Sequence, residues 1–261
     1  MRSLTTAATG MMAQQLNVDV IAHNIANVTT TGFKRSRTEF ADLLYQDLRR
    51  VGTQSSDTAT IVPAGVRVGV GVKPIAIYRI TEQGSLIPTN NPLDVAIKGR
   101  GYFQVTLPDG TTAYTRDGAL RLSNDGTIVT ADGFALIPNI VVPDNATGIS
   151  INANGQVEVT IPGQIAPTLL GQLQLATFIN EAGMEQSGDN LLLETEASGG
   201  PVVGNPGAIG FGTLQQNFLE QSNVNMVSEM TDLITAQRAY EINSKVIQAS
   251  DDMMQTTTNI R

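Results

Sequence analysis

Apolar residues recur every seven positions in the last forty residues of the chain, from Ser222 to Arg261. Seven residues make almost two helical turns, so such a set lines one face of an α-helix, as in coiled coils. The repeat consists of Met226, Leu233, Tyr240, Ile247 and Met254, and the residues expected to widen the same stripe are Val227, Ile234, Val246 and Met253. Asn225 is the expected N-cap of this helix, and Glu229 suits the positive end of its dipole.

The first thirty residues carry a matching stripe. Leu4, Met11, Val18 and Ile25 are also spaced by seven. The helix should end near Asn27, since three threonines and a glycine follow it. We therefore predict two terminal helices, each with a narrow apolar face.

Two uses of these faces stay open, because a lone amphipathic helix usually covers its own protein whereas a coiled-coil stripe pairs with other helices. Polar residues stand four positions after several stripe residues, at Gln15, Gln237, Ser244 and Asp251. An isolated pair would then be weakly stable, which favours contact with helices of further copies. The expected self-assembly interface is Leu4, Met11, Val18, Ile25, Met226, Met230, Leu233, Tyr240, Ile247 and Met254.

The middle of the chain follows other rules, since all eleven prolines lie between Pro63 and Pro206. Phe33–Arg50 has apolar residues at helical spacing and is predicted as a short helix. Val51–Pro63 is polar and gives no regular element, so it is a free linker or a segment ordered by neighbouring subunits. Val66–Val72 alternates like a half-buried strand, and its glycines match no phosphate-loop motif.

Residues 75–195 read as short strands bounded by turns. The predicted strands are Ile75–Ile80, Leu93–Ile97, Tyr102–Leu107, Thr112–Thr115, Leu120–Leu122, Thr127–Thr130, Phe134–Ile137, Ile149–Ile151, Val157–Ile161, Gln172–Ile179 and Leu191–Leu193. Dipeptides that favour tight hairpins stand at Asp109-Gly110, Asp117-Gly118, Asp125-Gly126, Asp132-Gly133 and Asn154-Gly155. Neither type of calcium loop is present.

The predicted fold class is α+β, with the terminal helices forming a coiled coil and a mainly β middle domain built as an irregular sandwich or barrel. The expected domains are a helical domain of residues 1–32 with 218–261, a connecting segment of 33–74 with 198–217, and a β-rich outer domain of 75–197. An extended loop at 46–63 belongs to the connecting segment.

Composition narrows the function. A net charge of −8 without a basic patch argues against nucleic-acid binding, and no apolar run is long enough to insert into a membrane. The chain has no cysteine and one histidine, His23, which we expect to be structural or exposed. No metal, cofactor or catalytic cluster is visible, although a glycosidase could use a carboxylate pair such as Asp94 with Asp117.

Three stretches resemble bacterial flagellar rod and hook proteins. NIANVTTTGFKRSRTEF at Asn24–Phe40 is similar to their N-terminal signature, and Ser222–Met254 to their C-terminal signature. Thr89–Val105 together with Pro108–Gly118 resembles the middle of the distal rod members. The motif residues are Asn24, Asn27, Gly32, Phe33, Asn223, Asn225, Arg238, Tyr240 and Asn243.

This resemblance implies a structural subunit, not an enzyme, that stacks helically into a hollow, straight distal rod and transmits torque from motor to hook. The implied partners are further copies, proximal rod proteins, the hook protein, the surrounding P-ring and L-ring proteins and the flagellar type III export apparatus. The implied location is the basal body, where the rod crosses the periplasm, reached without a cleaved signal peptide. In the family, a longer segment at 46–63 accompanies straight, rigid tubes.

Other functions remain alternatives. A proximal rod or hook subunit would share the signatures, and a β-domain adhesin or binding module would use the middle of the chain. The carboxylate pair keeps a glycosidase open.

Overall fold

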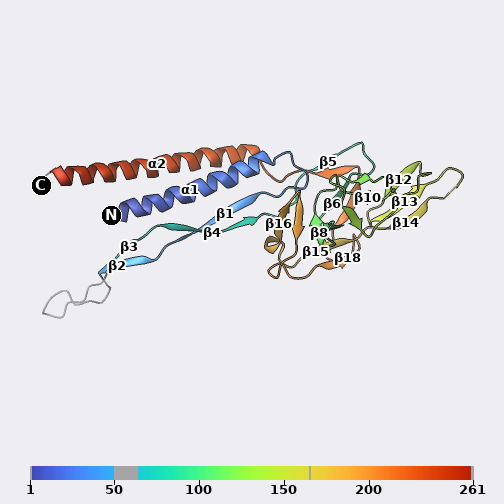
Figure 1. The fold of residues 1–261 in the computed structure, drawn as a ribbon, viewed down its shortest axis with the longest axis horizontal. Coiled ribbons are helices and arrows are strands. Elements are labelled where there is room, and N and C mark those ends of the chain that lie inside the picture. Colours follow the sequence, from blue (N-terminus) through green and yellow to red (C-terminus); the bar gives the residue numbers. More distant parts are fainter. Residues whose placement is uncertain (1, 50–63, 165, 260–261) are drawn as a thin grey trace. The chain divides into compact units, whose positions relative to one another are not determined.

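The structure is a computed structural model that describes residues 2–49, 64–164 and 166–259. It divides into two compact units (Figure 1). The first, here the helical unit, contains residues 1–25, 36–78 and 225–261; the second, the β unit, contains residues 26–35 and 79–224. Each is described by itself.

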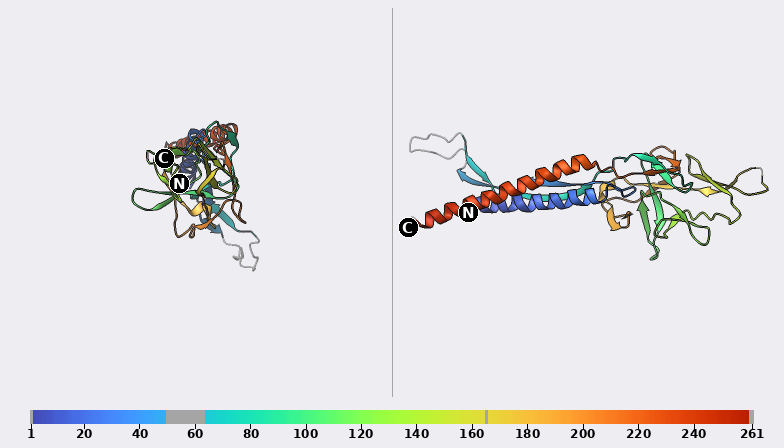
Figure 2. Two further views of the ribbon diagram at one scale, coloured as in Figure 1. Left: turned by 90° about the vertical axis from the view of Figure 1, so that its right-hand side faces the viewer. Right: turned by 90° about the horizontal axis from the view of Figure 1, so that it is seen from above.

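The helical unit holds two long helices, α1 (Arg2–Ala26) and α2 (Met226–Asn259). They run antiparallel and side by side, as Figures 1 and 2 show. The prediction of two terminal helices is confirmed, and α1 ends one residue before the predicted Asn27.

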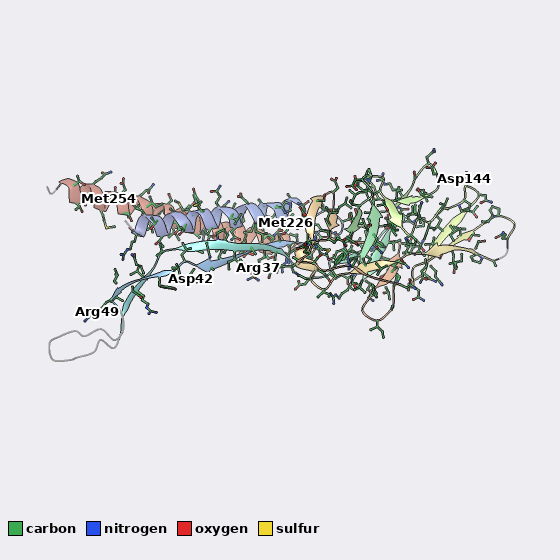
Figure 3. All side chains as sticks on the ribbon, turned by 60° about the horizontal axis from the view of Figure 1, so that its bottom comes forward. Arg37, Asp42, Arg49, Asp144, Met226 and Met254 are labelled. Carbon is green, nitrogen blue, oxygen red and sulfur yellow. The ribbon has the colours of Figure 1, made fainter. Side chains whose placement is uncertain are left out.

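An extended ribbon completes this unit where the sequence predicted a helix at Phe33–Arg50. Its strands are β1 (Ser36–Asp42), β2 (Tyr45–Arg49), β3 (Val66–Gly69) and β4 (Val72–Arg79). β1 pairs with β4 and β2 pairs antiparallel with β3. The helix prediction was wrong because strand pairing and bonds from α1 hold β1 extended, which overrides the helical spacing of its apolar residues. Figure 3 marks the ribbon at Arg37, Asp42 and Arg49.

The β unit is a mainly antiparallel β structure without a closed barrel among its described residues. Its strands are β5 (Leu86–Pro88), β6 (Val95–Lys98), β7 (Tyr102–Thr106), β8 (Thr112–Thr115), β9 (Arg121–Leu122), β10 (Ile128–Val129), β11 (Ala135–Ile137), β12 (Gly148–Ile151), β13 (Gln156–Thr160), β14 (Thr168–Gln172), β15 (Leu175–Thr177), β16 (Glu185–Gly188), β17 (Leu191–Leu193), β18 (Val202–Gly204), β19 (Thr213–Gln216) and β20 (Phe218–Glu220), with a 3-10 turn at Glu181–Gly183. The predicted α+β class is confirmed.

Nine strands form the largest sheet, with β16-β17-β8-β7-β11-β10-β9 in order and β15 and β18 branching from β7. In its register Phe103 lies opposite Thr115 and also opposite Leu175. Separate small sheets join β12-β13-β14, β19-β6 and β20-β5. These sheets enclose one large apolar core around Phe103, Leu136 and Leu173.

Four of the five predicted Asp-Gly and Asn-Gly turns have the left-handed glycine that tight hairpins need, at Gly110, Gly126, Gly133 and Gly155. Asp117-Gly118 was wrongly predicted as a hairpin turn. It instead passes close to β6: Val95 donates its backbone N–H to Gly118 O at 3.0 Å, and a Cβ at Gly118 would lie only 1.8 Å from Val95 O. Glycine is required there for close approach.

Candidate self-assembly interface

Asn225 begins α2 as predicted. Its side-chain Oδ1 accepts hydrogen bonds from the backbone N–H of Val227 at 3.1 Å and of Ser228 at 3.4 Å. These two amides have no partner within the helix, so the cap fixes the residue at which α2 starts. The N-cap prediction is confirmed.

A seam of small and polar residues joins α1 to α2. Ser250 Oγ donates to Ser3 Oγ at 3.3 Å, and Asn24 Nδ2 donates to Glu229 Oε2 at 3.1 Å. Between these pairs, a Cβ on Gly10 would lie 3.0 Å from Asn243 Nδ2. The contacts step by seven residues along both helices in opposite directions, and the same step matches Asn17 with Ala236. We call these eight residues the polar seam: Ser3, Gly10, Asn17, Asn24, Glu229, Ala236, Asn243 and Ser250.

Asn24 also ties the seam to the ribbon. Its side chain is 2% exposed, its Nδ2 donates to Ser36 O at 2.9 Å, and its Oδ1 accepts from Ser36 N–H at 2.9 Å. Thr38 Oγ1 donates to Asn17 Oδ1 at 2.7 Å one strand-face repeat further on. One buried amide thus holds α1, α2 and the start of β1 together, and this satisfies its hydrogen-bonding capacity without water.

Sequence reasoning chose the wrong partner positions for the stripe. It paired each stripe residue of α2 with the residue four positions later, whereas the structure buries the residues three positions later, from Glu229 to Ser250. Small side chains at these positions let the two backbones approach, which large apolar residues would prevent. The available signal was a second period of seven, in which each seam residue of α1 stands one position before a stripe residue.

The predicted α1 stripe therefore lies beside the seam. Leu4, Met11, Val18 and Ile25 each follow a seam residue, which turns them about 100° around the helix, and all four are half-buried.

On α2, Met226, Met230 and Tyr240 are 45%, 51% and 43% exposed, while Leu233, Ile247 and Met254 are half-buried. Figure 3 labels Met226 and Met254 near the two ends of this helix. Of these six residues, Met226, Met230, Leu233 and Tyr240 lie to one side of the seam, whereas Ile247 and Met254 lie near its centre.

These two sets of residues lie on one side of the helix pair. The helices run antiparallel, so a turn in the same rotational sense from the seam leads to the same side on both. We name this surface the first flank: Leu4, Met11, Val18 and Ile25 of α1 with Met226, Met230, Leu233 and Tyr240 of α2.

Four residues expected to widen the stripe point elsewhere. Val227 and Ile234 are 76% and 49% exposed on the outer side of α2, away from α1. Val246 and Met253 are 42% and 62% exposed on the side of α2 opposite the first flank. That interpretation was wrong because 3.6 residues per turn spread these positions around most of the helix.

Other motif residues brace the β unit. Asn223 Oδ1 accepts from Arg35 N–H at 2.8 Å, and its Nδ2 donates to Ile80 O at 3.0 Å. Gly32 has a left-handed φ of 67° and donates its N–H to Glu220 O at 2.8 Å. Asn27 accepts from Thr30, and Phe33 O accepts from Asn223 N–H. Arg238 and His23 are exposed on the helices.

A buried ion cluster, absent from the sequence predictions, joins the same strands. Glu220 Oε1 lies 2.5 Å from Lys34 Nζ, and Glu220 Oε2 lies 2.6 Å from Arg116 Nε. The Glu220 side chain is 1% exposed. Arg116 also donates to the carbonyls of Ile97 and Gly99 at 3.1 and 2.6 Å, so its remaining N–H groups are occupied.

The cluster shifts its two partners differently. Burial alone would raise the pKa of Glu220, but Arg116 and Lys34 outweigh it and hold that pKa below 4.5. Burial lowers the pKa of Lys34 below 10.5, because a carboxylate shared with Arg116 does not replace all the lost water. Glu220 is therefore the member that the cluster keeps charged.

The candidate carboxylates Asp94 and Asp117 have local structural partners. Asp94 accepts from Asn91 Nδ2 at 2.8 Å, and Asp117 accepts from Thr31 Oγ1 at 2.9 Å and from Ala119 N–H at 3.0 Å. The described residues contain no group of three or more potential metal ligands. Within the same ranges, neither long helix has an apolar stretch sufficient to cross a membrane.

Three family models match the chain. Residues 4–34 match "Flagella basal body rod protein", residues 96–159 match "Flagellar hook protein FlgE/F/G D1 domain", and residues 215–260 match "Flagellar basal body rod FlgEFG protein C-terminal". The outer two matches contain α1 and nearly all of α2.

Relatives match along the whole length. The flagellar basal-body rod protein FlgG of Caulobacter vibrioides is 56% identical over 100% of both chains. Those of Agrobacterium fabrum and Bacillus subtilis are 53% identical over 97% of both chains and 38% identical over 100% of this chain and 99% of theirs. The chain belongs to the family of flagellar basal-body rod proteins.

Proposed function

We propose that this chain is the structural subunit of the distal rod, and that it self-assembles helically into a straight tube that transmits torque from motor to hook. The single observation that carries this proposal is the first flank. It is an apolar surface eight residues long in its membership, spread over both helices, and left half-covered by the chain itself. Contiguous exposed apolar surface of this kind marks an interaction site.

The rest of the helical unit supports the same role. Its buried apolar residues are Ala7, Ala13, Val20, Ile21 and Ala236, which amount to a thin core for helices of this length. A pair joined by a polar seam gains little from its own contact, so helices of neighbouring copies would supply most of the apolar burial.

The proposed partners follow from the family. They are further copies of this chain, proximal rod proteins on one side and the hook protein on the other, the P-ring and L-ring proteins around the tube, and the export apparatus. The proposed location is the rod across the periplasm. The segment 46–63 would bridge neighbouring subunits and stiffen the tube; residues 46–49 belong to β2, and residues 50–63 lie outside the described ranges.

The test is a pair of acidic substitutions on α2. Met230→Asp should abolish tube formation, because burying a carboxylate in an apolar contact costs several kcal/mol. Val227→Asp is the matched control, since Val227 is even more exposed but lies outside the first flank. Assembly is measured by sedimentation and by electron microscopy, which also separates a straight rod from a curved hook.

The two variants should share the circular dichroism spectrum of the parent chain in its unassembled state. Normal straight tubes from Met230→Asp would refute the role of the first flank. Failure of the parent chain to form tubes would refute the proposed function itself.

A further inference from the structure

A second apolar stripe runs along α2 on the side opposite the first flank. It consists of Ala239, Ile242, Val246, Ala249 and Met253, spaced by three, four, three and four residues. This is the spacing of a coiled-coil contact surface. Ile242, Val246 and Met253 are 61%, 42% and 62% exposed. We name these five residues the second flank.

The two flanks differ in shape and position. The first flank is a groove between two helices, and its α2 residues lie in the N-terminal half, from Met226 to Tyr240. The second flank is a ridge on one helix and lies in the C-terminal half, from residue 239 to residue 253. A ridge of heptad spacing fits a groove between helices better than it fits another ridge.

We propose, resting on the assembly argued above, that the second flank of one copy docks into the first flank of the next copy. The occupant is thus α2 of a second copy of this chain. Because the two surfaces differ, the contact is head-to-tail and leaves one unused flank at each end. Such a contact cannot close into a symmetric dimer and builds an open helical array.

The heptads also fix the stagger between copies. With parallel helices, a shift of thirteen residues places Ala239 opposite Met226, Val246 opposite Leu233, and Met253 opposite Tyr240. This shift uses every exposed α2 residue of the first flank, and it sets a small side chain against a large one and a thioether against an aromatic ring. Thirteen residues correspond to about 20 Å along the helix axis.

A shorter stagger of six residues would keep the heptads matched but would leave Met226 uncovered, although it is 45% exposed. In that arrangement Val246 would lie opposite Tyr240 instead of Leu233. The two staggers therefore bring different residue pairs together, and a cross-link can distinguish them.

The chain contains no cysteine, so engineered thiols report single contacts. The experiment mixes full-length Tyr240→Cys with full-length Met253→Cys, assembles them, oxidises them and measures disulfide-linked dimers on a non-reducing gel. Disulfides need Cα atoms about 4.4–6.8 Å apart. We expect at least ten times more dimer in the mixture than in either variant alone. Val227→Cys mixed with Met253→Cys is the control and should show no such gain.

Each other outcome overturns part of the argument. Dimers from Tyr240→Cys alone would mean like-to-like contact of first flanks. Cross-linking of Val246→Cys with Tyr240→Cys, instead of Met253→Cys with Tyr240→Cys, would replace the thirteen-residue stagger by the six-residue one. Straight tubes without any of these cross-links would refute flank-to-flank docking and leave the rod function standing, whereas absence of tubes from the unmodified chain would refute both.

Discussion

The helical unit and the β unit use apolar residues in opposite ways. All the largest fully buried side chains among the described residues lie in the β unit, including Phe103, Tyr114 and Leu136. Sixteen of the 24 exposed large apolar side chains lie in the helical unit, although it is the shorter of the two. The β unit has therefore completed its core within one chain, and the helical unit keeps its apolar surface for contact outside it.

The largest effect on the comparison should come from the core of the β unit. Phe103→Ala removes a side chain that is 0% exposed and should lower the free energy of unfolding by about 3–5 kcal/mol. The matched change in the helical unit is Met230→Ala, which should cost the unassembled chain less than about 0.5 kcal/mol. Urea unfolding of both variants measures the contrast. Equal losses would contradict the division into a closed and an open unit.

A second prediction concerns the ion cluster of the β unit. Glu220→Gln leaves Lys34 and Arg116 buried without their carboxylate and should cost about 3 kcal/mol at pH 7. Chemical denaturation at constant salt gives this value. Asp144→Asn is the control, because Asp144 is an exposed carboxylate of the same unit, and it should leave the free energy of unfolding unchanged.

The same cluster predicts a pH dependence. The folded-state pKa of Glu220 lies below its ordinary value of 4.5, so its stabilising contribution is complete above pH 4.5 and is lost as the pH falls through the folded-state pKa. In acid titrations, the parent chain should therefore lose more stability below pH 4.5 than Glu220→Gln. Parallel curves for the two proteins would rule out Glu220 as a source of acid sensitivity.

The smallest of these effects should come from the polar seam. Asn24→Ala removes the bonds to Ser36 and Glu229 and should lower the free energy of unfolding by about 1–2 kcal/mol. Because β1 depends on these bonds, hydrogen exchange at Ser36 N–H should also accelerate. Asp19→Ala, an exposed change on the same helix, is the control. Unchanged exchange at Ser36 would mean that β1 does not depend on Asn24.

Much of the fold could be predicted locally. The helices at both ends, the cap at Asn225, Thr112–Thr115 as a strand and four hairpin glycines all follow from spacing and turn chemistry, which act within a few residues. The segment Ser36–Arg49 escaped prediction because Asn17 and Asn24, together with β4, hold β1 extended. Glu220 escaped for a similar reason, since its partners Lys34 and Arg116 are remote in the sequence.

The sequence by itself determined that both ends form helices with a period of seven, that the middle is β-rich, and that the signatures resemble flagellar rod proteins. Only the tertiary structure decided which face of each helix meets the other. A period of seven is satisfied equally by adjacent rows of residues, and the choice between them depends on which rows permit close approach across both helices. Ser3, Gly10, Asn24 and their partners on α2 permit it, and the apolar rows beside them are left facing outward.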